Sequence, residues 1–454
     1  MLLHRDRALA LMEETGVDAL LAGSATNVVY LTGYMSDVLL SPFYECQSTA
    51  ALARRPGAEP DLVSEPDILP LLRAGHDGPV DPSRGLASVC ERCADQLRCW
   101  GEPVLVLGER DLVTVADRPV PVRHLRTYDR LGFTSLLETA TGVAQTPAAE
   151  RNPLQSAIAA LRAYTQGTFS RSLVEATAAM LRDMGLDEAV IATDNLRLAS
   201  HLSPVLPRAR FVDGYDLFRR IRLVKTEEEI ALMRESMRIN EIGVRAAMAA
   251  TRAGVLWSDV LEEHRAAVAR AGGKWCGQWG ILFGPRHMSA FALENKGYRL
   301  RPGDAVVFDS LVQYRQYWSD MARTGVIGPA TERQRALYRA VRAAAEAVEA
   351  QALPGVHSSR LVEVAREALE REGAPASLCL LLPHGIGQEI FEFPGSYGRE
   401  HEGFTLEENM TINFEVLQHA PEDGGAFHLE ETLVVRRSGA ESLATMPREM
   451  LETA

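Results

Sequence analysis

The sequence contains few cysteines for its length. Six cysteines in 454 residues are too few for the disulfide framework of a small secreted protein. Cys90 and Cys93 form one isolated CxxC pair with Cys99 nearby, and no second pair follows them. Because a structural zinc site needs four ligands, reduced thiols are the better interpretation of these residues.

The sequence also lacks a long apolar run and a basic segment. No apolar stretch reaches the roughly 18 to 20 residues that a membrane-spanning helix needs, and charged residues interrupt the N-terminal apolar pattern. The 61 acidic and 48 basic residues give a net charge of -13, which argues against a nucleic-acid partner. We therefore expect a cytoplasmic protein that binds neither nucleic acid nor membrane.

What is present is an ordinary globular composition, with 46% hydrophobic and 24% charged residues. The chain is longer than one hydrophobic core usually supports, so two domains are expected. Thr226 and Glu229 have the spacing of a capping box, which predicts the start of a long helix. The predicted domains are therefore residues 1–222 and residues 223–454.

The two predicted domains differ in their patterns. In the first, an apolar strand between Gly16 and Gly23, a helix over 168–186 and a strand over 188–193 indicate an α/β domain. In the second, helices over 332–352 and 358–372 and strands over 410–417 and 427–436 predict helices packed against antiparallel strands. The fold class is thus α+β.

Two aspartates are predicted to lie side by side in the second domain. Residues 305–309 form an apolar strand that ends at Asp309, and a turn at 313–316 brings back the segment that holds Asp320. Unpaired carboxylates are costly in an apolar sheet, so this pairing indicates a bound cation.

Three further candidate ligands follow along the chain. His384 lies in a glycine-rich segment, and Glu415 and Glu430 each lie within an apolar, strand-like run. Taken singly, each is better explained as an edge-strand carboxylate or a core histidine. Together with the two aspartates they form an oxygen-rich set with one imidazole, which suits manganese, cobalt, iron or zinc.

These segments resemble the metallopeptidase family M24, the group of aminopeptidase P, prolidase and creatinase, whose catalytic domain has the pita-bread fold. The matching stretches are Gly303–Asp309, Tyr314–Thr324, His384–Gly387, Phe414–Glu415, Leu429–Thr432, and in the first half Gly16–Leu21, Asn27–Tyr34 and Arg222–Ile230. The resemblance implies a creatinase-type N-terminal α/β domain and a homodimer.

The resemblance also implies a catalytic centre with two divalent metal ions, manganese being the first candidate. Asp309 and Glu430 are expected to bridge or chelate the metals, and Asp320, His384 and Glu415 to complete their coordination. Glu415 is the expected general base for a metal-activated water. We expect Glu415, His384 and His428 to act in catalysis.

The sequence departs from the family at three positions that surround the metals. Two family histidines align with Phe291 and Phe391, and a family arginine aligns with His428. Loss of such polar groups typically slows acyl transfer by hundreds-fold unless another group replaces them. His287, His419 and His428 are candidates for that replacement. The residues expected to contact the substrate are Phe291, Phe391, His287, Trp279 and Tyr317.

These departures favour a metal-dependent hydrolase that cleaves a C–N bond in a specialised small or zwitterionic substrate. Three alternatives remain: an Xaa-Pro dipeptidase or aminopeptidase acting on short peptides, a metal-dependent lyase, and a pita-bread protein that only binds partners. The last is disfavoured because this chain retains all five expected metal ligands.

Overall fold

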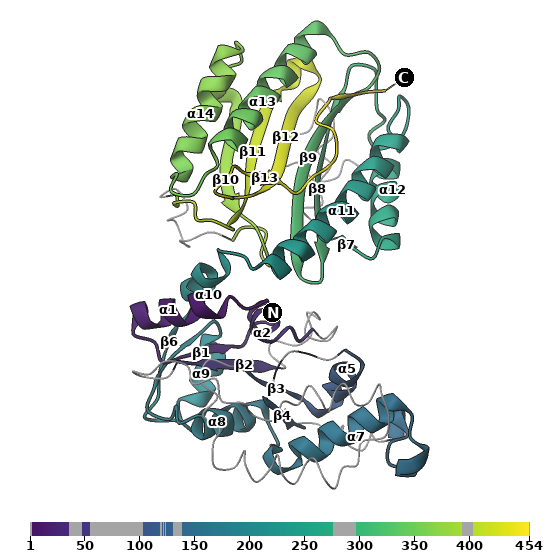
Figure 1. The fold of residues 1–454 in the computed structure, drawn as a ribbon. Helices are drawn as coiled ribbons and strands as arrows, with labels where there is room; N and C mark the ends of the chain where they lie inside the picture. The colour runs from purple at the N-terminus through teal and green to yellow at the C-terminus, as the bar shows by residue number, and fades with distance from the viewer. Residues whose placement is uncertain are drawn as a thin grey trace. The chain divides into compact units, whose positions relative to one another are not determined.

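The computed structural model describes residues 2–35, 48–54, 103–118, 120, 122, 124–129, 139–275, 297–392 and 403–453. The chain divides into two compact units, Met1–Ile221 and Arg222–Ala454 (Figure 1). Within the described residues, no helix is both long enough and apolar enough to cross a membrane. Cys90 and Cys93 lie outside the described residues.

The first unit contains a six-stranded mixed sheet with the order β4-β3-β2-β1-β5-β6. β2 runs antiparallel to both β1 and β3, whereas the pairs β1/β5, β5/β6 and β3/β4 are parallel. The strands are β1 (Ala19–Ala22), β2 (Thr49–Ala53), β3 (Val104–Gly108), β4 (His124–Tyr128), β5 (Val190–Thr193) and β6 (Arg210–Asp213).

Helices cover both faces of this sheet, because its strands carry apolar side chains on both faces. Leu20 packs in a cluster with one group of helices: α1 (Arg5–Thr15), α2 (Ala25–Thr32), α5 (Leu112–Asp117), α7 (Pro153–Thr165) and α10 (Tyr215–Arg222). Leu21 packs on the other face with α8 (Leu173–Asp183) and α9 (Leu196–Leu202).

Helix α8 begins later than residue 168, where the sequence pattern placed its start. Ser172 is its N-cap, and the serine side chain accepts a hydrogen bond from the backbone N–H of Glu175. A capping serine leaves the helical conformation, so the residues before it belong to the preceding segment.

The second unit contains an eight-stranded sheet whose main path is β10-β11-β12-β9-β8-β7. Neighbours on this path are antiparallel, β13 pairs with β12, and β14 pairs with β9. The strands are β7 (Lys274–Trp275), β8 (Ala305–Tyr314), β9 (Tyr317–Val326), β10 (Cys379–Gly385), β11 (Thr411–Ala420), β12 (Gly425–Val434), β13 (Glu441–Ser442) and β14 (Leu451–Glu452).

Two helix pairs accompany this sheet, α11 (Glu227–Ala250) with α12 (Trp257–Arg270), and α13 (Glu332–Gln351) with α14 (Ser358–Arg371). α11 packs on β8 and β9, α13 on β11 and β12, and α14 on β10 (Figure 1). The predicted capping box is present, since the Thr226 and Glu229 side chains each accept the other residue's backbone N–H. The predicted arrangement of helices on antiparallel strands is thus confirmed.

The strand alternation separates a helix-covered face of this sheet from a polar face. Ser310 is hydrogen-bonded to His264 of α12, and Ser319 is hydrogen-bonded to Ser236 of α11. Because neighbouring residues of a strand point to opposite faces, Asp309 next to Ser310 and Asp320 next to Ser319 point away from these helices.

A two-residue turn fixes the register of the β8–β9 hairpin. Tyr314 pairs with Tyr317, and the intervening Arg315 and Gln316 have φ values of 46° and 70°. Positive φ at both central residues gives the turn a twist that matches the twist of the strands. The predicted hairpin is therefore present, and its strands extend further than the short apolar runs of the sequence.

Candidate metal centre

The five predicted metal ligands converge on the polar face of the second sheet. β8 carries Asp309, β9 carries Asp320, β10 carries His384, β11 carries Glu415 and β12 carries Glu430. Glu415 and Glu430 are direct partners across β11 and β12, and Asp309 and Glu430 both lie opposite Ala322 of β9. Sheet register, rather than nearness in sequence, brings the set together.

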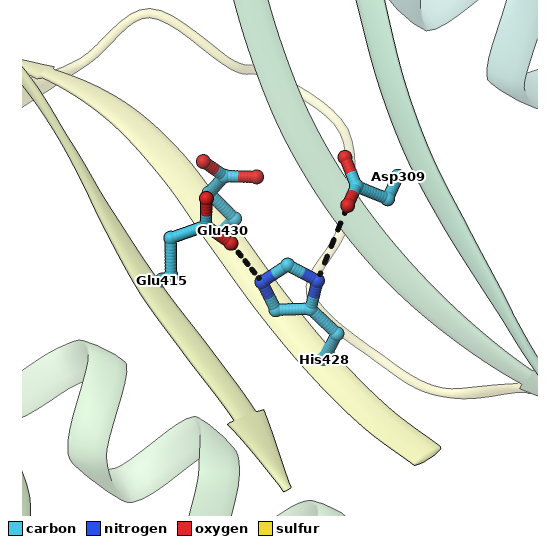
Figure 2. A group of neighbouring side chains, drawn as sticks. All are labelled: Asp309, Glu415, His428 and Glu430. Atoms are coloured by element: carbon cyan, nitrogen blue, oxygen red, sulfur yellow. Dashed lines mark ion pairs between the residues drawn. The ribbon is translucent and has the colours of Figure 1, made fainter. Parts of the chain in front are cut away.

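The ligand atoms form two overlapping groups. Asp309, Glu415, His428 and Glu430 make one group, and Asp320, His384 and Glu430 make the other; within each, the candidate ligand atoms lie within 4.8 Å of one another. Figure 2 shows the first group, with the His428 ring between Asp309 and Glu415. Since Glu430 belongs to both groups, the described residues offer two adjacent sites that share one carboxylate.

His384 presents one ring nitrogen to the carboxylates. Its Nδ1 lies 3.1 Å from the backbone oxygen of Gly385, which can only accept a hydrogen bond, so Nδ1 carries the proton. Nε2 lies 3.7 Å from both Glu415 Oε1 and Glu430 Oε1 and 4.0 Å from Asp320 Oδ2. The Gly385 contact thus fixes the tautomer that leaves Nε2 ready to bind a metal.

The carboxylates of this site are crowded and buried. Burial raises the pKa of Asp309 well above its usual value, and the charges of Glu430 and Glu415 raise it further. Burial and the neighbouring charges of Glu430, Asp309 and Glu415 likewise raise the pKa of Asp320 well above its usual value. A divalent cation would reverse this effect, because it favours the ionised form of each carboxylate.

The pairing of histidines with glutamates opposes the effect of burial on the pKa values of Glu415 and His384. Burial by itself would raise the pKa of Glu415, but His384 and His428 beside it lower that pKa to about 2. Burial by itself would lower the pKa of His384, but Glu415 and Glu430 raise it to about 9.

Several buried polar atoms of the site have no hydrogen-bond partner within the described residues. They are Asp320 Oδ1, Glu430 Oε2, His384 Nε2 and both ring nitrogens of His428. Buried polar atoms are normally paired, so this group of atoms facing one another fits a metal-binding role. The donor set of carboxylate oxygens and imidazole nitrogens suits divalent transition metals.

Side chains that the sequence analysis missed hold this arrangement in place. Asn413 donates to Glu430 Oε1 over 2.8 Å and to the Asp320 backbone oxygen over 3.1 Å, and Thr432 donates to that same oxygen. Asn413 could have been found from its spacing, because it lies two residues before Glu415 on β11 and its side chain therefore points to the same face. Such contacts orient ligands and tune their basicity.

A buried ionic network holds the loop that follows His384. Glu392 Oε1 lies 2.5 Å from Arg222 Nε, and its Oε2 lies 2.6 Å from Lys225 Nζ. Burial works to raise the pKa of Glu392, but Lys225 and Arg222 outweigh it and lower that pKa. The Glu392 backbone N–H also donates to the Gly385 oxygen, so the network closes directly beside His384.

The predicted substrate-contacting residues have different outcomes. The Phe391 ring centroid lies 4.6 Å from that of His384, and the Phe391 side chain is 40% exposed, so it borders the site. Tyr317 is buried and donates its hydroxyl proton to Glu229 of α11 over 3.0 Å. That position gives no support to the predicted substrate contact. Trp279, His287 and Phe291 lie outside the described residues.

Comparison with known proteins places this site in a family context. The sequence profile of metallopeptidase family M24 matches residues 231–437. An Xaa-Pro dipeptidase of Pyrococcus furiosus is 31% identical over 240 residues, which cover 52% of this chain and 67% of that protein. A putative dipeptidase of Bacillus subtilis is 28% identical over 274 residues, which cover 60% of this chain and 74% of that protein.

Solved structures show the same fold at low sequence identity. The prolidase of Pyrococcus horikoshii OT3 matches with a TM-score of 0.64 and 18% identity over 98% of this chain and 99% of that one. The X-Pro aminopeptidase of Thermotoga maritima matches with a TM-score of 0.67 and 18% identity over 98% and 100%. The predicted fold class is therefore confirmed. The chain belongs to metallopeptidase family M24 and is a metal-dependent hydrolase.

Proposed function

We propose that this protein is a dinuclear-metal hydrolase that cleaves an amide-like C–N bond in a specialised small or zwitterionic substrate. The observation that carries the proposal is the convergence of Asp309, Asp320, His384, Glu415 and Glu430, with unpartnered buried ligand atoms facing one another. These five residues would hold two divalent cations, for which manganese is the first candidate and cobalt, iron and zinc are alternatives.

The bound cations would supply an activated water at neutral pH and polarise the scissile group. Glu415 would accept the proton of that water. Its carboxylate oxygens lie 3.7 Å from His384 Nε2 and 3.2 Å from His428 Nε2, so it stands between the two imidazoles of the site. Asn413, hydrogen-bonded to Glu430, keeps the shared carboxylate oriented.

The surroundings of the metal set support a substrate other than a general peptide. Phe391 places an exposed phenyl ring against His384, where it offers an apolar contact and no hydrogen-bond donor. The face of such a ring attracts a substituted ammonium group, as a small zwitterion would provide. His428 is fully buried and faces Glu415, so it does not extend as a long cationic side chain toward a substrate carboxylate.

A second candidate function is hydrolysis of Xaa-Pro dipeptides. It is favoured by the Pyrococcus furiosus relative, which is named an Xaa-Pro dipeptidase and is 31% identical over the matched region. A third is a metal-dependent elimination, which the same metal set would support with a different substrate.

Turnover assays with product analysis separate these candidates. Metal-supplemented protein is incubated with Xaa-Pro dipeptides and with small zwitterionic amides, and the products are identified by mass spectrometry. We expect an amide substrate to take up water and release an amine. An alkene product would instead indicate a lyase. Efficient cleavage of Xaa-Pro dipeptides would overturn the proposal that the substrate is a specialised small molecule.

Two glutamate variants show whether the activity belongs to this site. Glu415→Ala should abolish turnover, because it removes the proposed proton acceptor. Glu422→Ala, which removes an exposed glutamate in the turn after β11, should retain it. Equal activity of the two variants would contradict the assignment of Glu415.

A further inference from the structure

His428 lies on the metal-facing side of β12. It precedes Glu430 by two residues on the same strand, so both side chains point to the same face. Its backbone is fixed by Thr324 of β9, whose hydroxyl donates to the His428 oxygen over 2.9 Å and accepts from the His428 N–H over 2.8 Å. The ring is therefore held at the site by the sheet itself.

The ring of His428 is fully buried between two candidate ligands. Nδ1 lies 3.8 Å from Asp309 Oδ2, and Nε2 lies 3.2 Å from Glu415 Oε2 (Figure 2). In the described part of the chain neither nitrogen forms a well-directed hydrogen bond, although Nε2 is within ion-pair distance of Glu415. A purely structural histidine at this depth would normally be hydrogen-bonded through at least one nitrogen.

The spacing of these groups fits shared coordination of one ion. Zinc binds imidazole nitrogen and carboxylate oxygen at about 2.0 to 2.2 Å, so two ligands of the same ion stand about 3 to 4 Å apart. The distances from His428 to Asp309 and Glu415, 3.8 Å and 3.2 Å, lie in that range. His384 stands in the same relation to the other two ligands of the neighbouring group, at 4.0 Å from Asp320 and 3.7 Å from Glu430.

We propose that His428 is a sixth protein ligand of the dinuclear centre and binds, through one ring nitrogen, the metal held by Asp309, Glu415 and Glu430. Each metal then has one imidazole, His428 on one side and His384 on the other, and Glu430 lies between them. This inference rests on the proposed dinuclear centre and adds a ligand to it.

The proposed ligand changes which metal the site should prefer. A site made only of carboxylates suits manganese or magnesium, whereas an added imidazole favours zinc, iron or nickel. At the position that His428 joins, we therefore expect zinc or iron to be preferred over manganese.

A crystal structure of the zinc-loaded wild-type protein tests this ligand directly. We expect anomalous scattering to locate two zinc ions, one of them about 2.1 Å from a His428 ring nitrogen. Two zinc ions that both lie more than about 3 Å from His428 would overturn the inference but leave the dinuclear centre standing. A protein that binds no zinc and no manganese would overturn the proposed function as well.

Zinc titration of variants gives a second readout that does not depend on turnover. His428→Ala should weaken one of the two zinc sites by at least about tenfold in competition with a chromophoric chelator, since even outer contacts of a ligand are worth that much. His201→Ala removes an exposed imidazole on α9 of the first unit and should leave both sites unchanged. Equal zinc affinity in His428→Ala and wild type would contradict ligation by His428.

Discussion

At the scale of single residues, the position that most distinguishes this site is Phe391. Its ring packs at 4.6 Å from the His384 ring, and 40% of its surface is exposed. An aromatic ring there can line a pocket but can neither donate a proton nor bind an oxyanion. The proposed substrate preference therefore depends on this one side chain more than on the metal ligands.

Replacing Phe391 with histidine should shift the enzyme toward peptides. We expect Phe391→His to raise kcat/KM for Xaa-Pro dipeptides by about 100-fold, the usual effect of one oxyanion-stabilising donor. Phe391→Leu is the matched control, because it changes the ring without adding a donor and should give no gain. If both variants show the wild-type rate on these dipeptides, Phe391 does not determine the substrate.

The candidate metal ligands and Tyr317 show how much of a site can be predicted from a sequence. The five candidate ligands were predictable because carboxylates embedded in apolar strands are conspicuous, and the structure brings them together. The substrate contact of Tyr317 stays a prediction, because the face of this side chain depends on the hairpin register, which turns its hydroxyl toward Glu229. A one-residue change of register reverses the face of every side chain, and local sequence does not report it.

At the scale of elements, the loop that follows β10 connects His384 to the start of the second unit. Glu392 in this loop is fully buried with Lys225 and Arg222, which precede α11. Gly387 lies against this network, and the Trp318 N–H of β9 donates to the Gly387 oxygen over 2.8 Å. The network should therefore control the position of His384.

Gly387→Ala should destabilise this loop. A Cβ atom at residue 387 would overlap Glu392 Oε2 and lie 2.8 Å from Lys225 Cε, and both side chains are held by their ion pair. We expect a loss of about 1 to 3 kcal/mol in unfolding free energy from this overpacking, measured by urea denaturation. Gly297→Ala has open space around its new methyl group and serves as the control. Equal stability of the two variants would show that the loop moves aside freely.

Lys225→Met should remove one partner of the buried Glu392 carboxylate. Breaking a buried pair typically costs about 3 to 5 kcal/mol, and the lower end is expected because Arg222 remains. Arg437→Met breaks an exposed pair with Glu408 and should cost at most about 1 kcal/mol. Combining Lys225→Met with Glu392→Gln should cost less than the sum of the two single changes, and strict additivity would argue against the network.

Element boundaries show the same limit of sequence information. The start of α11 was predictable because Thr226 and Glu229 form a local capping box that the structure contains. The full length of β8, Ala305–Tyr314, was not, because its second half is set by pairing with β9 rather than by its own apolar pattern. The order β10-β11-β12-β9-β8 likewise follows from long-range pairing.

At the scale of the whole molecule, the candidate ligands come from five strands of the second unit, between Asp309 and Glu430. A metal bound to all of them ties together strands that are far apart in the sequence. Binding to the folded state alone stabilises a protein by mass action, by about 2.7 kcal/mol when the free metal is at 100 times its dissociation constant. Metal content and stability of the second unit should therefore be coupled.

Removal of metal should lower the melting temperature of the protein. We expect a chelator to reduce the Tm and added zinc or manganese to restore it, as followed by calorimetry. A variant with Asp309→Asn and Asp320→Asn should show no such response, because it lacks one carboxylate from each ligand group. A Tm that is insensitive to both chelator and metal would show that the site does not bind metal in the folded protein.

The metal content of the native protein tests the central claim most directly. The protein is purified without chelator, and its transition metals are counted per chain by inductively coupled plasma mass spectrometry. A dinuclear centre built from Asp309, Asp320, His384, Glu415 and Glu430 predicts about two metal ions per chain. A protein that carries no transition metal, and takes up none when manganese or zinc is added, would contradict the account.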